Sequence, residues 1–184
     1  MARYVPEAFV GNLQELAPYV ERELWRIAQE LDLVSGGGTL YRATDTPALP
    51  TVAPGVGWEK LVDFDAAAPQ RGATAVVLSV PESEIGLRRP QTWGASFVVS
   101  AVGLTNQREY EVRVFLNGNP TPLAAILDPS NQTTQATFSA VGVFRNFGPP
   151  HQPDVIDLRI RTRDGIDGTW STLNAYFAVW SVGG

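Results

Sequence analysis

Residues 110–116, which read Tyr-Glu-Val-Arg-Val-Phe-Leu, decide the fold. Successive side chains of a β-strand point to opposite faces, so a period of two in hydrophobicity predicts a strand with one buried face. Four apolar side chains share one face here, namely Tyr110, Val112, Val114 and Leu116. Residues 156–163 repeat the period, with apolar side chains at Ile156, Leu158 and Ile160 between Asp157, Arg159 and Arg161.

Working outward from these two stretches, we find the same signature in four further segments. They are residues 73–80, 94–102, 135–147 and 173–182. Turn-forming sequences separate the strands, namely Asn117-Gly118, Asp128-Pro129, Gly148-Pro149-Pro150, Asp164-Gly165 and Asp167-Gly168. At least six strands with no helix between them predict an all-β fold, an antiparallel, jelly-roll-like β-sandwich over residues 58–184.

The first 35 residues follow a different period. Asn12 and Glu15 are spaced as a capping box, and apolar residues then recur at spacings of four and three. The seam consists of Leu13, Ala17, Val20, Leu24, Ile27, Leu31 and Val34. Pro18 is unfavourable inside a helix, so a helix that starts near this residue is the alternative. We predict an anchor and oligomerisation helix within residues 1–35.

A linker arm is predicted between the helix and the sandwich, over residues 36–57. Three consecutive glycines, Gly36 to Gly38, end the helix, and Pro47, Pro50 and Pro54 follow without a helical period. We expect this arm to be mobile in the free protein and to become ordered against a neighbouring subunit.

Composition excludes several functional classes. The 184 residues carry a net charge of -5 with no basic block, which argues against nucleic-acid binding. There is no cysteine and a single histidine, His151, so disulfides and thiolate metal sites are impossible and histidine-dependent catalysis must use His151. The sequence contains no run of 18 apolar residues, so it predicts no membrane-spanning helix. We expect no catalytic residue, no metal and no cofactor.

Three polar clusters each have a functional and a plain interpretation. Residues 164–168, Asp-Gly-Ile-Asp-Gly, faintly resemble a calcium loop but equally suit a tight turn. Residues 81–84, Pro-Glu-Ser-Glu, read as a polar loop. Arg159, Arg161 and Arg163 form a stripe that either engages an acidic surface or glycan, or is crossed by neighbouring carboxylates such as Glu109 and Glu111.

The last predicted strand is apolar on both faces. Leu173, Phe177 and Val179 lie on one side, and Tyr176, Trp180 and Val182 on the other. Because an antiparallel sandwich normally exposes one face to water, the second face predicts cover by another subunit. The expected oligomer interface comprises Tyr176, Trp180 and Val182 with the seam residues Leu13, Val20, Leu24, Ile27 and Leu31. Trp93 and Trp170, near loops, either stack on a glycan or pack in the core.

The order of these parts resembles that of tailed-bacteriophage virion proteins. Tyr4-Val5-Pro6 and residues 16–28 (Leu-Ala-Pro-Tyr-Val-Glu-Arg-Glu-Leu-Trp-Arg-Ile-Ala) resemble the N-terminal anchor of small phage structural proteins. Gly57-Trp58 through residues 175–180 (Ala-Tyr-Phe-Ala-Val-Trp) resembles the jelly-roll modules of phage fibres and capsid decoration proteins. Those modules are similar to the trimeric sandwiches of the tumour-necrosis-factor and C1q type. The resemblance implies a homotrimer attached to a capsid or tail.

Oligomeric state also follows from the seam itself. Leu24 and Leu31 occupy the a positions of the seam, and the β-branched Val20 and Ile27 occupy d positions. This arrangement disfavours a two-helix coiled coil, so we predict a trimer, with a tetramer as the alternative. We therefore expect a non-enzymatic capsid decoration protein or head fibre, assembled into virions in the host cytoplasm. Two alternatives remain, a tail fibre or tail-fibre adaptor and a carbohydrate-binding module for the host surface. A polysaccharide depolymerase is disfavoured, because no nucleophile is paired with a base.

Overall fold

The computed structural model describes residues 36–44, 46–69, 75–88, 90–127, 135–146 and 154–182. The helix predicted within residues 1–35, including the five seam residues of the expected interface, lies outside the described residues. His151 lies outside them as well.

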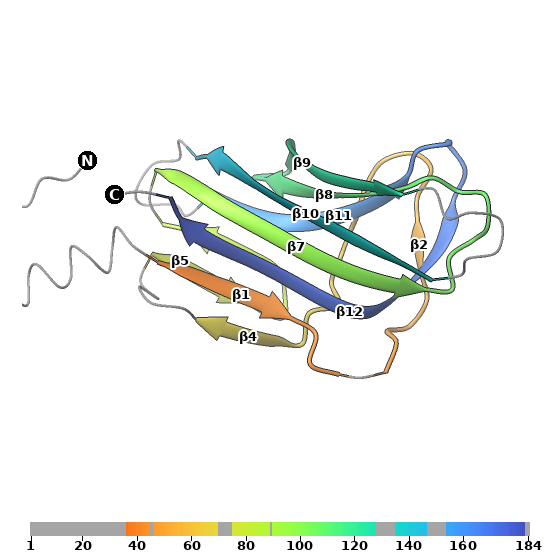
Figure 1. The fold of residues 1–184 in the computed structure, drawn as a ribbon, viewed down its shortest axis with the longest axis horizontal. Coiled ribbons are helices and arrows are strands. Elements are labelled where there is room, and N and C mark those ends of the chain that lie inside the picture. The colour runs from red at the N-terminus through yellow and green to blue at the C-terminus, as the bar shows by residue number, and fades with distance from the viewer. Residues whose placement is uncertain are drawn as a thin grey trace, which may run out of the picture.

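Two antiparallel sheets pack face to face as a β-sandwich, which confirms the predicted fold class (Figure 1). The first sheet has the order β10 (Gln135–Arg145), β7 (Thr92–Val102), β12 (Gly168–Ser181), β1 (Gly37–Tyr41) and β4 (Ala66–Pro69), and β2 (Thr51–Ala53) pairs with β12. The second has the order β5 (Val76–Ser79), β6 (Glu84–Leu87), β11 (Asp154–Thr162), β8 (Tyr110–Leu116) and β9 (Asn119–Leu127), and β3 (Glu59–Lys60) pairs with β11.

The hydrophobic core lies between the two sheets and follows the alternation in the sequence. On β8 and β11 the side chains predicted to face inward are buried, apart from the partly buried Leu116. Each large apolar side chain removed from water contributes about 1.5–3 kcal/mol. The largest buried ones are Trp93, Trp170, Tyr110, Phe97, Phe138 and Phe177.

Asn117 and Gly118 form the predicted hairpin turn between β8 and β9. Both residues have positive φ, 49° and 76°, as the two central positions of a type I′ turn require. The Asn117 side chain also accepts a hydrogen bond from the Val155 amide (2.8 Å) and donates one to the Asp154 carboxylate (2.6 Å). The turn is therefore tied to the start of β11.

The residues expected to begin a linker arm form strand β1 instead. Gly37–Tyr41 pairs with β12 on one side and β4 on the other, and Leu40 is fully buried. A Cβ at Gly38 would lie 2.7 Å from a methyl carbon of Leu78 on the opposite sheet. Close approach of the two sheets thus accounts for the glycine at position 38. This corrects the prediction that the three glycines begin a linker arm.

Residues 46–65, which we call the strap, cross from the first sheet to the second and return. Strand β2 pairs with β12 and strand β3 pairs with β11, so the strap is joined to both sheets. Ala53, Leu61 and Phe64 bury their side chains in the core. Most of the predicted arm is therefore attached to its own sandwich.

Six of the twelve strands in the described residues lie outside the predicted segments, namely β1, β2, β3, β4, β6 and β9, and the last two occupy stretches with turn-forming or proline residues. Residues 81–84 were interpreted as a polar loop, and the chain does turn there, but Glu84 already begins β6. Strand β9 contains Pro120 and Pro122, which are tolerated because β9 is an edge strand of the second sheet.

Candidate functional site: two contrasting outer faces

The outer face of the second sheet is built around the carboxylate of Glu111, which is 0% exposed. Arg161 donates to it from the neighbouring strand through Nε (2.9 Å) and a terminal nitrogen (2.8 Å). Arg113 donates from two residues along β8 (2.7 Å), and Arg163 lies at 3.7 Å. Three guanidinium groups thus compensate one buried negative charge, which removes the cost of burying it unpaired.

The strap covers this network with an aromatic ring. Trp58 packs edge-on against Phe115, with ring centroids 4.9 Å apart, and the guanidinium of Arg161 lies 4.4 Å from the Trp58 ring. Arg159 stacks over Phe115 at 4.5 Å and is held by Asp157 through two hydrogen bonds (2.8 and 3.0 Å). Phe115 and Asp157 are consequently buried although they point away from the core.

The predicted arginine stripe is therefore crossed by carboxylates, the plainer of its two interpretations. Arg161 pairs with Glu111, and Arg163 pairs with Glu109. The chain itself occupies much of the hydrogen-bonding capacity that an acidic partner would need.

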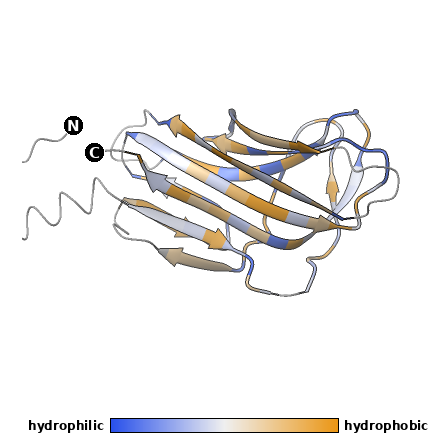
Figure 2. Ribbon diagram, viewed as in Figure 1, coloured by the Kyte–Doolittle hydropathy of each residue, from blue (hydrophilic) through white to orange (hydrophobic). Residues whose placement is uncertain are grey.

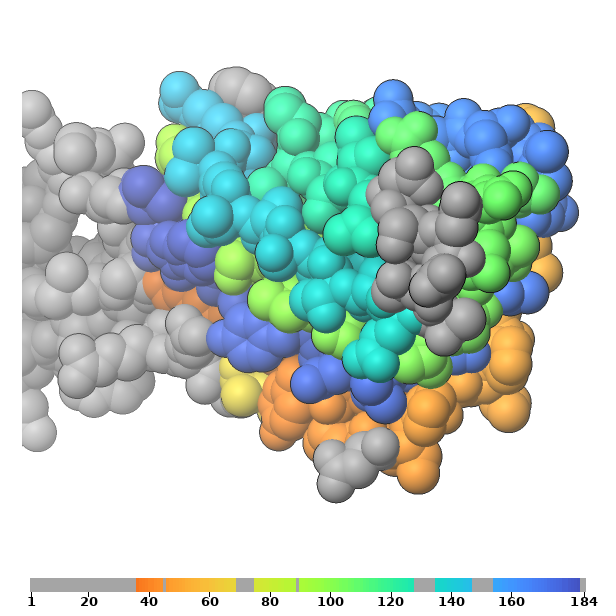
Figure 3. Space-filling view, turned by 45° about the vertical axis from the view of Figure 1, so that its right-hand side comes forward, coloured from red at the N-terminus to blue at the C-terminus, as the bar shows by residue number. Residues whose placement is uncertain are grey.

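The outer face of the first sheet is uncharged over most of its width. Its outward-facing side chains on β1, β4, β7, β10 and β12 include only one charged group among the described residues, Arg145 at the end of β10. Val141 is 71% exposed, Val143 66% and Tyr176 42%. Figure 2 shows these strands mostly in pale to orange colours, and in Figure 3 β10, β7, β12 and β1 form adjacent bands across one surface.

Trp180 lies flat on this face because its neighbour is glycine. Gly94 stands opposite Trp180 in the register, and a Cβ there would come within 2.2 Å of the indole ring. Val143 stands opposite Gly94 on the next strand. Trp180, Gly94 and Val143 thus lie side by side on three neighbouring strands and form an apolar row on the outer face of the sheet.

Of the three C-terminal residues expected in the interface, two lie on β12 and face outward. Tyr176 lies beside Thr39 of β1, with their hydroxyl oxygens 3.5 Å apart, and Trp180 lies over Gly94. Val182 follows the end of β12 and is exposed. A hollow of about 460 Å³ lies between Tyr41, Tyr176 and Arg42.

Trp93 and Trp170 pack in the core, which is the plainer of the two interpretations of these residues. Their exposed fractions are 0% and 1%, and both rings face the core. Trp93 Nε1 donates to the Asn146 side chain (3.2 Å), and Trp170 Nε1 donates to the Thr172 hydroxyl (2.9 Å). A buried indole N–H needs such a partner, and both tryptophans find one inside the sandwich.

The Asp-Gly-Ile-Asp-Gly segment at residues 164–168 is a turn with occupied carboxylates. Asp164 pairs with Arg108 (3.2 Å) and accepts the Ile166 amide (3.2 Å), while Asp167 accepts the Gly55 amide (2.8 Å). No group of three or more potential metal-ligating side chains occurs in the described part of the chain. Within the same residues, no helix has the length and apolar character needed to cross a membrane.

The comparisons with known proteins agree with this architecture. No family model and no curated protein matches the sequence. The globular domain of zebrafish complement 1qA protein superimposes with a TM-score of 0.53 at 12% identity, covering 81% of this chain and 98% of that one. Eiger TNF from S. frugiperda gives 0.56 at 5% identity, covering 81% and 93%.

A virion protein also shares the fold. The PRD1 vertex protein P5 superimposes with a TM-score of 0.50 at 13% identity, covering 81% of this chain and 74% of that one. At these identities the similarities establish the fold alone. The chain thus shares the jelly-roll sandwich fold of these proteins.

Proposed function

We propose that this chain is a non-enzymatic structural protein of a bacteriophage virion, a homotrimeric decoration or fibre protein. In this proposal the first sheet's outer face joins the three copies, and the N-terminal segment attaches the trimer to the capsid. The observation that carries the proposal is the uncovered, uncharged outer face of the first sheet.

The contrast with the second sheet supports an oligomer. There the chain supplies its own cover, since the strap and the arginine network bury Phe115, Glu111 and Asp157. Nothing comparable covers the first sheet within the described residues, where Val141, Val143 and Tyr176 remain exposed. A face this apolar and this poor in charge is typical of the buried centre of an interface between subunits.

A closed ring of three copies is the simplest assembly that buries such a face. Ring-forming contacts are heterologous, so the uncharged face of one copy meets a different surface of the next. The sandwiches that the sequence resembles are trimeric, which supports three copies.

The virion assignment is supported by the order of parts in the sequence and by the fold shared with the PRD1 vertex protein. A tail fibre or tail-fibre adaptor fits the same observations. The carbohydrate-binding alternative has lost its two candidate tryptophans, because Trp93 and Trp170 are buried.

Light scattering after size exclusion tests the proposal on the full chain and on a chain lacking residues 1–35. We expect three times the mass of one chain for the full protein. A trimer in both samples places the main contact in the sandwich, whereas a trimer only in the full chain places it in residues 1–35. A monomer in both overturns the trimer.

Antibody labelling of purified virus particles tests the location. Turnover of capsule or cell-wall polymers by the purified protein would overturn the non-enzymatic role.

A further inference from the structure

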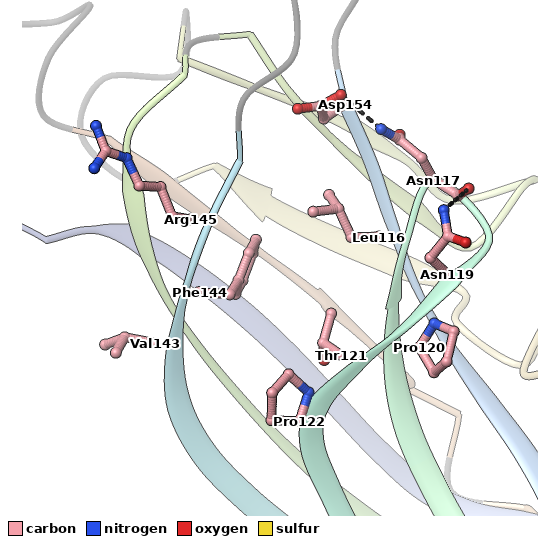
Figure 4. Close-up of a pocket in the computed structure, with 10 residues that line it drawn as sticks. All are labelled: Leu116, Asn117, Asn119, Pro120, Thr121, Pro122, Val143, Phe144, Arg145 and Asp154. Atoms are coloured by element: carbon pink, nitrogen blue, oxygen red, sulfur yellow. Dashed lines mark hydrogen bonds between the residues drawn. The ribbon is translucent and has the colours of Figure 1, made fainter.

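A cleft of about 720 Å³ opens at the edge of the sandwich, between the β8–β9 hairpin and the end of β10 (Figure 4). Leu116 and Phe144 point toward one another across it, and Pro120 and Pro122 form the wall on β9. Asn117, Asn119, Arg145 and Asp154 lie around the hairpin end of the cleft. Its size is that of a ligand pocket, and its walls are mainly apolar.

The cleft lies at the end of the sandwich where the described chain begins. Gly37 stands opposite Trp180, Trp180 opposite Gly94, and Gly94 opposite Val143, which lines the cleft. Three strand spacings of roughly 4.8 Å separate Gly37 from Val143, or about 14 Å. Five extended residues span about 17 Å, so five residues before Gly36 are enough chain to cover this distance, and residues up to Leu31 are available to bind the cleft.

We propose that the cleft binds the N-terminal segment of this chain, residues 1–35, through apolar side chains of its seam. This inference rests on the proposed function, in which the same segment carries the trimer to its attachment site. Thirty-five residues precede the described part, and they include five large apolar side chains at helical spacing, namely Leu13, Val20, Leu24, Ile27 and Leu31. Those side chains match the apolar walls of the cleft.

The two prolines indicate how the segment binds. Pro120 and Pro122 have no N–H, so this part of the β9 edge offers an added strand too few hydrogen bonds. Thr121, between them, uses its hydroxyl to donate to the Val114 carbonyl (2.8 Å). A helix needs no such bonds, because it docks through side chains at positions i, i+3, i+4 and i+7. The seam has this spacing.

Cross-linking tests the inference in the full chain, which contains no native cysteine. In the double variant Leu31→Cys with Asn119→Cys, a short bis-maleimide joins the seam to the exposed rim of the cleft. The matched control combines Leu31→Cys with Asn106→Cys, an exposed position beyond the far end of β7. That strand of 11 residues places the control about 35 Å away.

We expect at least tenfold more cross-linked product for the cleft pair than for the control pair. Product at the mass of one chain shows that the segment fills the cleft of its own copy, and product at twice that mass shows binding to a neighbour. Adding Pro122→Asp, an exposed change that the fold tolerates, should lower the yield several-fold. Equal yields for the cleft and control pairs overturn the inference.

Light scattering of the same samples separates this inference from the proposed function. A trimer that gives no specific cross-link refutes the cleft assignment and leaves the trimer standing. A monomer that cross-links within one chain refutes the trimer and supports the cleft assignment.

Discussion

The two sheets of this sandwich solve the problem of their outer faces differently. The second sheet carries charge on its outer face and covers it with its own chain, so that Glu111 is fully buried among three arginines beneath Trp58. The first sheet carries almost no charge outside and is left open by the described residues. A charged face can be buried only against groups that pair with its charges. An apolar face can be buried against any complementary apolar surface, including one on another copy of the chain.

With the proposed trimer, this difference leads us to expect that one face contributes to stability and the other to assembly. The network around Glu111 is complete within one chain and needs no other molecule. Among the described residues, nothing covers the row of Trp180, Gly94 and Val143 in the same way. Substitutions on the second face should therefore change unfolding, and substitutions on the first should change the mass of the assembly.

Glu111→Ala should have the largest effect on unfolding. The variant loses the hydrogen bonds that Arg113 and Arg161 donate to the carboxylate, each worth roughly 1.5–3 kcal/mol, and it leaves three neighbouring positive charges without this carboxylate. Urea denaturation measures the change. Glu109→Ala is the matched control, because its pair with Arg163 is far more exposed and worth about 0.2–1 kcal/mol. Equal losses in the two variants would show that the buried network has no special role.

Val141→Asp should break the assembly and leave the fold intact. Val141 is exposed in one copy, so the carboxylate stays solvated in the monomer, whereas burial in the proposed trimer would cost more than the roughly 1–3 kcal/mol of an unpaired neutral polar group. Light scattering over a dilution series should show the variant dissociating at higher concentration than the parent. Ile166→Asp, an exposed apolar position in the turn beyond β11, is the control. An unchanged mass for Val141→Asp would remove this surface from the interface.

The sequence predicted the parts of this comparison that depend on local pattern. Alternation over residues 110–116 and 156–163 was sufficient for β8 and β11, and the Asn-Gly pair was sufficient for the turn that joins β8 to β9. Trp93 lies two and four residues before Ala95 and Phe97, so all three point to the same face of β7. This spacing in the sequence is sufficient to predict that the tryptophan lies in the core.

Other parts depend on contacts between distant segments, which local pattern does not contain. The burial of Gly38 follows from Leu78 on the opposite sheet, so three glycines alone gave the wrong impression of a linker. The cover over Glu111 comes from Trp58, more than 50 residues earlier in the chain. The sequence therefore predicted that carboxylates cross the arginine stripe, but not that the chain buries them.

Trp58→Ala should have a smaller effect on unfolding than Glu111→Ala. The indole is half-buried and contacts Phe115 and Arg161, so its loss should cost about 2 kcal/mol. Hydrogen exchange should also become faster at the amides of β3, the part of the strap that pairs with β11. Val56→Ala, a change at an exposed strap residue, should stay within about 0.5 kcal/mol. A neutral Trp58→Ala would mean that the arginine network needs no cover.

The smallest effect concerns the base of the strap, where Asp65 accepts the Thr44 hydroxyl and the amides of Ala43 (2.5 Å) and Thr44 (3.1 Å). These hydrogen bonds, led by that from the Thr44 side chain, lower the pKa of Asp65 below its ordinary value. A lowered folded-state pKa means that the carboxylate stabilises the fold above its unfolded pKa, and that this contribution disappears as pH falls through the folded value.

Asp65→Asn should therefore melt slightly below the parent at pH 7, and the difference should shrink as the pH falls through the acidic range. The carboxylate is exposed, so the change should be small beside the two substitutions on the second face. Thermal melts of both proteins from pH 7 to pH 3 measure it. Asp164→Asn, whose carboxylate pairs with Arg108 outside the strap, controls for the loss of one negative charge. A difference independent of pH would show that the strap is closed by its buried residues, Ala53, Leu61 and Phe64, without help from Asp65.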